Sequence, residues 1–125
     1  MRRAVVMVID GLRADMVGAH YTPRLADIVE RSRWFTGQRS VFPSATRVNS
    51  ASIATGCWPK SHGLAGNAIA LDEGEGLQAV SVGPPDFRDR LRRATGRTLH
   101  RPTLSERLRP HGGAVIYSNS SAGSA

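Results

Sequence analysis

The sequence predicts an α/β fold in which a mostly parallel sheet is flanked by helices. Two apolar runs rich in β-branched residues, residues 4–9 and 114–117, have the composition of strands buried on both faces of a parallel sheet. Between them, residues 22–32 carry apolar side chains at the spacing of three and four that is typical of an amphipathic helix. Buried strands that alternate with helices are the pattern of an α/β domain.

The first half of the chain gives the clearest element signals. The strand over residues 4–9 ends at Asp10-Gly11, and Thr22-Pro23 predicts the capped start of a helix that ends near Ser32. The aromatic and β-branched content of residues 34–42 predicts an extended segment that Pro43 ends. A short helix packed through small residues is expected over residues 46–55, with Gly56 as its C-cap.

The second half has weaker signals. Residues 57–85 hold too many Gly, Pro and polar residues for a continuous element, so we predict a loop with an exposed turn at residues 72–76. Helices are expected over residues 86–94 and 103–109, before the strand at residues 114–117.

The length of 125 residues allows at most one domain. Residues 118–125 are small and polar and stand where an α/β unit would turn into its next helix. A parallel sheet of two or three strands with an open edge is marginal. We therefore expect residues 1–125 either to be a fragment of one domain or to receive the remaining strands of the sheet from elsewhere.

Composition excludes several classes of protein. The hydrophobic fraction of 40% and the charged fraction of 22% are ordinary for globular proteins. The single cysteine, Cys57, excludes an intrachain disulfide and the Cys-rich zinc motifs, so any metal would need oxygen and nitrogen ligands. Because no apolar run approaches the roughly 18 residues of a membrane span, we expect no membrane partner and a cytoplasmic protein.

The net charge of +7 favours anionic partners. However, the arginines are scattered along the chain and are not interleaved with aromatic residues, so we expect no specific nucleic-acid partner. The densest cluster mixes acids with bases and is interpreted as a solvated helix face; its members are Asp86, Arg88, Asp89, Arg90, Arg92 and Arg93. Nothing in the sequence indicates an oligomeric state.

Two positions can carry chemistry. Asp10 follows a predicted strand at the sheet end where α/β proteins bind ligands, and it is either a metal ligand or a cap of the following turn. Thr46 opens a predicted helix, whose N–H groups and dipole favour an alkoxide and attract phosphate oxygens. It is therefore either a nucleophile or a plain N-cap, and the cap is the commoner role of a threonine there.

Four motifs in a fixed order resemble the alkaline phosphatase superfamily, in its nucleotide pyrophosphatase/phosphodiesterase and phosphonoacetate hydrolase branch. They are Asp-Gly-x-Arg at residues 10–13, Pro-x-x-Thr-x-x-Asn at 43–49, Thr-Gly at 55–56 and Pro-x-x-His-Gly at 59–63. The resemblance spans about residues 4–67. It implies the N-terminal part of an alkaline-phosphatase-like sandwich.

The resemblance also implies roles for three residues. Asp10 would bind one of two divalent metal ions, which would be zinc, and Thr46 would bind the same ion and attack phosphorus to give a phospho-threonine. Asn49 would donate its amide to a non-bridging oxygen of a small phosphate- or phosphonate-containing substrate. The family's later Asp-x-x-x-His, Asp-His and single His elements supply the remaining ligands of both ions. They have no counterpart in this sequence, so all ligands of the second ion and the rest of those of the first are missing.

The remaining signals refine this interpretation. His62 belongs to a motif that these families keep as a structural turn, so we do not expect it to bind metal. His62-Gly63-Leu64-Ala65-Gly66-Asn67 is similar to the His-Gly-x-x-Gly-Asn of phosphonoacetate hydrolases and favours a small phosphonate. Because the ligand set is incomplete, the alternative is a non-catalytic truncated product or a phosphate-binding domain.

Overall fold

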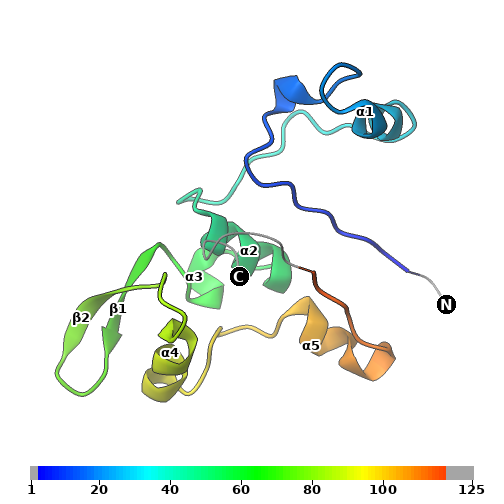
Figure 1. Cartoon of the computed structure of the whole chain (residues 1–125). Coiled ribbons are helices and arrows are strands. Elements are labelled where there is room, and N and C mark those ends of the chain that lie inside the picture. Colours follow the sequence, from blue (N-terminus) through cyan, green and yellow to red (C-terminus); the bar gives the residue numbers. More distant parts are fainter. Residues whose placement is uncertain (1–2, 118–125) are drawn as a thin grey trace. The chain divides into compact units, whose positions relative to one another are not determined.

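The computed structural model describes residues 3–117 of the chain. It divides into two compact units, Met1–Arg39 and Ser40–Ala125. The first holds the 3-10 helix η1 (Ala14–Met16) and α1 (Pro23–Glu30). The second holds, in chain order, α2 (Thr46–Thr55), α3 (Pro59–His62), β1 (Ala68–Asp72), β2 (Leu77–Ser81), α4 (Phe87–Thr95), α5 (Leu104–Leu108) and η2 (Arg109–His111) (Figure 1).

The first unit confirms the predicted helix at residues 22–32. Helix α1 begins with Pro23 in its first turn and ends at Glu30. Thr22 does not cap it through its side chain, because the hydroxyl instead accepts from the Gly18 N–H at 3.0 Å and donates to the Met16 carbonyl at 3.1 Å. The threonine thus closes the loop that precedes the helix.

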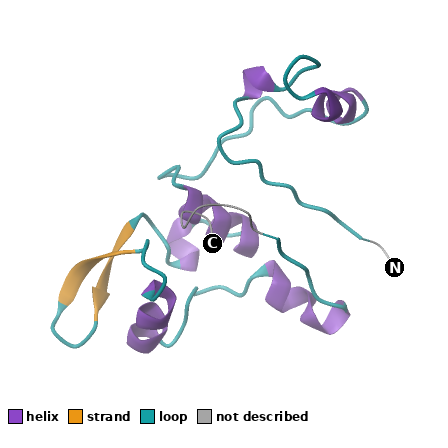
Figure 2. Cartoon of the chain, in the orientation of Figure 1, coloured by secondary structure: helices purple, strands orange, loops and turns teal. Residues whose placement is uncertain are grey.

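The prediction of a buried strand at residues 4–9 is wrong for this structure. The segment is extended and is drawn as a loop, without strand assignment (Figure 2). Its apolar side chains from Val5 to Ile9 are 48–87% exposed. A central strand forms only when neighbouring strands accept its ladder of hydrogen bonds. Within residues 3–117 the sheet consists of β1 and β2, which are antiparallel, so no parallel neighbour is described there.

Residues 34–42 also form no strand in the structure. Three of their aromatic side chains are exposed, at Trp34, Phe35 and Phe42. These residues therefore have the composition of a strand, but no strand in the described part of the chain pairs with them.

The core of the second unit lies between the β1–β2 hairpin and α4. It is formed by buried apolar side chains, those of Leu71, Val80, Val82, Phe87 and Leu91. The predicted loop over residues 57–85 is consequently wrong, since this stretch contains α3 and both strands. The exposed turn at residues 72–76 is confirmed, because the Asp72 carboxylate accepts from the N–H groups of Gly74 and Gly76 at 2.8 and 3.0 Å.

Helices α2, α4 and α5 confirm three predictions to within about one residue at most ends. In contrast, residues 114–117 form no strand, and Val115, Ile116 and Tyr117 are 75–93% exposed. The explanation is the same as for residues 4–9, because no strand pairs with this segment among the described residues. The small, polar segment at residues 118–125, where the sequence analysis placed the turn toward a next helix, lies outside the described residues. No helix in residues 3–117 is long and apolar enough to cross a membrane.

Candidate active site

Asp10 lies in the first unit, at the turn that follows the extended segment. It is exposed, and Gly11 beside it has a φ of 76°, which allows the chain to reverse at low cost. Arg13 of the same motif pairs with Asp15, through bonds of 2.9 and 2.6 Å from its guanidinium to the two carboxylate oxygens. This contact lowers the pKa of Asp15. The motif therefore supplies a carboxylate at the end of an extended chain.

Thr46 lies in the second unit and is the first residue of α2. The N-cap is Ala45, so the alternative in which Thr46 merely caps the helix is wrong. An alanine side chain cannot accept a hydrogen bond, and no side chain caps α2. Thr46 is half-buried and lies in the first turn of α2, where the backbone N–H groups and the positive end of the helix dipole are found. This environment favours an anion beside Thr46.

Asn49 follows one turn later on α2, on the same face as Thr46. Its side-chain amide donates to the Ala45 carbonyl at 3.0 Å, and its carbonyl oxygen accepts from the Val41 N–H at 3.2 Å. Asn49 therefore fixes the segment that leads into Thr46. A primary amide has a second N–H, so this contact does not exhaust its donors. The sequence predicted a substrate donor and missed this bracing role, for which an Asn three residues after a helix start gives no distinct signal.

His62 fastens α3 to α2. Its side chain is 0% exposed, and its Nε2 lies 2.9 Å from the Ser52 hydroxyl. Its Nδ1 accepts from the Leu64 N–H at 3.2 Å, so a neutral ring must carry its proton on Nε2 and donate it to Ser52. Burial lowers the pKa of His62, which keeps the ring neutral. Both ring nitrogens are engaged, which supports the structural role expected for this histidine.

Gly63 extends this arrangement. Its φ of 87° lies in the left-handed region, and a Cβ there would come within 2.1 Å of the His100 ring. The His100 N–H also donates to the His62 carbonyl at 3.0 Å. The His-Gly pair of the motif is therefore required by conformation and by close packing, and the segment after α4 is held against α3.

The described residues do not complete a metal site. No group of three or more His, Cys, Asp or Glu side chains within residues 3–117 is placed to hold a metal ion. Asp10 and Thr46 stand in different units, each described by itself. The two predicted ligands are one carboxylate and one hydroxyl, whereas a catalytic zinc ordinarily takes three protein ligands.

Comparison with known proteins decides the family. A family model described as type I phosphodiesterase/nucleotide pyrophosphatase matches residues 4–99, a range that includes Asp10, Thr46, Asn49 and His62. The chain belongs to this family. Its membership in the alkaline phosphatase superfamily, expected from the four motifs, is thereby confirmed for the N-terminal part.

One curated relative supports the same assignment. The chain is 35% identical over 85 residues to an uncharacterized pyrophosphatase/phosphodiesterase of Schizosaccharomyces pombe. The matched segment covers 68% of this chain but 17% of the relative's length. No solved structure matches the chain.

Proposed function

We propose that the complete protein is a metal-dependent hydrolase of phosphodiester or pyrophosphate bonds, with Thr46 as its nucleophile. The observation that carries the proposal is the position of Thr46 at the uncapped start of α2, in a chain of the phosphodiesterase family. The matched segment is 17% of the length of the relative, so the activity belongs to the whole protein.

In the proposed reaction the Thr46 Oγ attacks phosphorus, a bond from Oγ to phosphorus forms, and the bond from phosphorus to the leaving-group oxygen breaks. The hydroxyl proton passes to solvent, and the phosphoryl group on Thr46 keeps its other substituent. Water then breaks the bond from Oγ to phosphorus, which releases the product and restores the hydroxyl. The N–H groups of the first turn of α2 and the second amide N–H of Asn49 would face the oxygens on which charge develops. The contacts of Asn49 with Val41 and Ala45 support this role, because they hold the amide beside the nucleophile before substrate arrives.

We further propose two divalent ions, zinc being the candidate, of which one would be held by Asp10 and Thr46. Such an ion would lower the pKa of the threonine hydroxyl and neutralise charge on the phosphoryl group. The second ion would take its ligands from outside this chain. The surrounding domain would be an alkaline-phosphatase-like sandwich with a mostly parallel sheet, of which residues 1–125 form the N-terminal part.

The substrate is proposed as a small phosphate- or phosphonate-containing molecule in the cytoplasm. Phosphonoacetate is a further candidate, supported by the His-Gly-x-x-Gly-Asn sequence at residues 62–67. Parallel assays with a phosphodiester, a nucleotide pyrophosphate and phosphonoacetate would rank these classes by kcat/KM.

The test is substitution of Thr46 by Ala in the complete protein, with bis(p-nitrophenyl) phosphate as substrate and zinc added. We expect hydrolysis to fall by at least about 10³-fold. Ser50→Ala, a hydroxyl removed from the same helix, is the matched control and should retain activity. Mass spectrometry of acid-quenched wild-type enzyme should find a p-nitrophenyl phosphoryl group on Thr46, because only one p-nitrophenol leaves when the intermediate forms. Normal zinc-dependent hydrolysis by Thr46→Ala would refute the proposal.

A zinc titration of these 125 residues distinguishes the proposed hydrolase from the alternative, a non-catalytic phosphate-binding product. Under our proposal the chain by itself holds an incomplete ligand set. Weak binding of at most one ion is expected, and the loss of that ion in Asp10→Asn would assign it. Zinc binding that Asp10→Asn leaves unchanged would remove Asp10 from the proposed site.

A further inference from the structure

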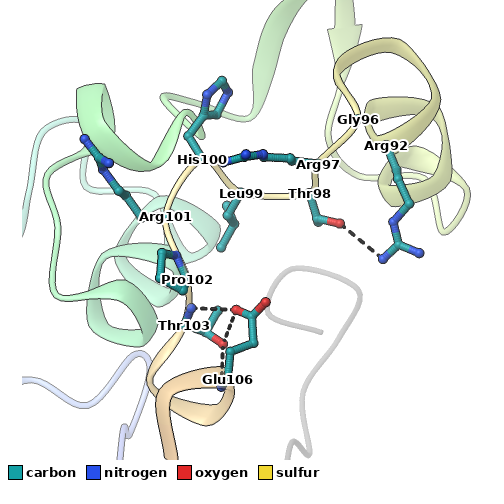
Figure 3. Close-up of a pocket in the computed structure, with 10 residues that line it drawn as sticks. All are labelled: Arg92, Gly96, Arg97, Thr98, Leu99, His100, Arg101, Pro102, Thr103 and Glu106. Atoms are coloured by element: carbon teal, nitrogen blue, oxygen red, sulfur yellow. Dashed lines mark hydrogen bonds between the residues drawn. The ribbon is translucent and has the colours of Figure 1, made fainter.

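The segment that joins α4 to α5, residues 96–103, lines a hollow of about 470 Å³. Arg92 at the end of α4 and Glu106 in α5 complete its lining (Figure 3). This volume falls within the range of small-molecule sites, about 300–1,000 Å³. None of the residues in the four family motifs lines it.

The charge around this hollow is unbalanced. Three arginines line it, Arg92, Arg97 and Arg101, against one carboxylate. That carboxylate, Glu106, already accepts from the Thr103 N–H at 2.6 Å and from its hydroxyl at 2.7 Å, and these bonds lower the pKa of Glu106. The Glu106 carboxylate is therefore engaged by the N-cap of α5 and does not pair with the arginines.

Within residues 3–117, none of the ion pairs that the structure describes joins an acid to Arg92, Arg97 or Arg101. In contrast, Arg90 of α4 forms an ion pair with Glu73, which lies in the turn between β1 and β2. The hydrogen bond described for these three guanidinium groups is a long one, from Arg92 to the Thr98 hydroxyl at 3.5 Å. Since each guanidinium has five N–H donors, donors far outnumber acceptors here.

The backbone that carries these arginines is fixed at both ends and in the middle. Gly96 caps α4 in the left-handed conformation, and the Thr95 hydroxyl donates to the Arg97 carbonyl at 2.8 Å. The His100 N–H bonds to the His62 carbonyl, and Thr103 begins the capping box of α5. A segment held in this way loses little conformational entropy when a ligand binds.

The directions of the side chains indicate the form of the ligand. In Figure 3, Arg92 turns toward Thr98, whereas Arg97 and Arg101 extend on the other side of the segment. The three guanidinium groups do not converge on one point, so a single oxyanion would contact only some of them. A chain of linked phosphates could reach several.

We propose that residues 92–103 bind a linear polyphosphate anion through Arg92, Arg97 and Arg101. The site goes beyond the proposed hydrolysis, because none of its residues belongs to the Thr46 motif. Charge-assisted bonds from planar guanidinium forks to phosphate oxygens supply the attraction. Because the arginines are solvent-exposed, the binding weakens as salt is raised.

Calorimetry with the 125-residue chain and no added metal tests this. Inorganic tripolyphosphate should bind at least about tenfold more tightly than inorganic phosphate. Arg97→Gln/Arg101→Gln should weaken tripolyphosphate binding by about tenfold or more. The matched control, Arg33→Gln/Arg39→Gln, removes the same charge from exposed arginines of the first unit and should leave binding within about twofold of wild type.

Several outcomes overturn the proposal. An equal loss in both double variants would show attraction to net charge alone, and equal affinity for phosphate and tripolyphosphate would exclude an extended site. Tighter binding of a single-stranded oligonucleotide than of tripolyphosphate would assign the surface to nucleic acid. Loss of binding in Thr46→Ala would place the anion at the nucleophile.

The control for folding is the thermal midpoint of each variant. We expect midpoints equal to that of the wild type, which would show that each loss of binding is a local effect of the substitution.

Discussion

His62 offers a direct test of how helix α2, which begins at Thr46, is held in the second unit. In His62→Ala the Ser52 hydroxyl and the Leu64 N–H each lose their partner on the ring, at about 1 kcal/mol each. The void left by a fully buried imidazole adds about 1 kcal/mol or more. We therefore expect a loss of about 3 kcal/mol in the free energy of unfolding, measured by urea denaturation at pH 7.5. This is a large part of the stability of an ordinary domain.

The same residue predicts a pH dependence. Burial lowers the pKa of His62 below its ordinary value of 6.5, so protons bind more readily to the unfolded chain. The contribution of the neutral ring is complete above pH 6.5 and decreases as the pH falls, until the pH passes below the folded pKa. The slope from this group is at most about 1.4 kcal/mol per pH unit.

His62→Gln is the matched variant, because it keeps a donor and an acceptor but does not titrate. Between pH 7.5 and 5.5 it should lose less stability than the wild type, and NMR titration of the wild-type ring should give a pKa below 6.5. A ring that titrates at or above 6.5, or equal acid sensitivity in the two proteins, would refute the reasoning.

Three further substitutions probe the second unit. Gly63→Ala forces a left-handed residue and a clash with the His100 ring, so thermal denaturation should show a loss of at least about 2 kcal/mol, whereas Ala at an unconstrained site would not. Thr103→Ala removes the hydroxyl from the capping box with Glu106 and should cost about 1 kcal/mol by the same measurement, with Thr103→Ser retaining most of the stability. Val48→Ala leaves a void at a 0% exposed position, and urea denaturation should show a loss of about 2 kcal/mol in the free energy of unfolding. An unchanged free energy of unfolding would contradict the packing described.

Local signals predicted the helices because their causes are local. Pro23 at the start of α1 and Gly56 at the end of α2 act within one turn of the elements they delimit. Thr103 and Glu106 form a cap across three residues. Each of these residues can be interpreted without knowing what the helix packs against.

Strands depend on partners that are distant in sequence, and there the prediction failed. The hairpin was missed because β1 and β2 bury a single residue each, Leu71 and Val80, which leaves no visible alternation. The segments at residues 4–9 and 114–117 have strong strand composition, yet no ladder forms with them in the described part of the chain. Amino-acid composition shows that a segment can pair as a strand, but it does not show which other strand it pairs with.

For the site, the sequence placed Thr46 and Asn49 correctly on α2. It did not show that Ala45 is the cap, or that Ser52 meets His62 ten residues later. The meeting of Asp10 with Thr46 at one metal ion stays a prediction, because it depends on how the two units combine.

The extended segment at residues 5–9 also bears on the handling of the isolated chain. Five consecutive apolar residues without proline, glycine or charge expose the N–H and C=O groups of a strand along with their side chains. Such a segment can add to the same segment of another molecule, edge to edge, and build intermolecular sheets. Arg3 and Asp10 stand at its two ends as the charged residues that oppose this stacking. We therefore expect that neutralising Arg3 or Asp10 would shift concentrated samples of the isolated chain toward aggregation.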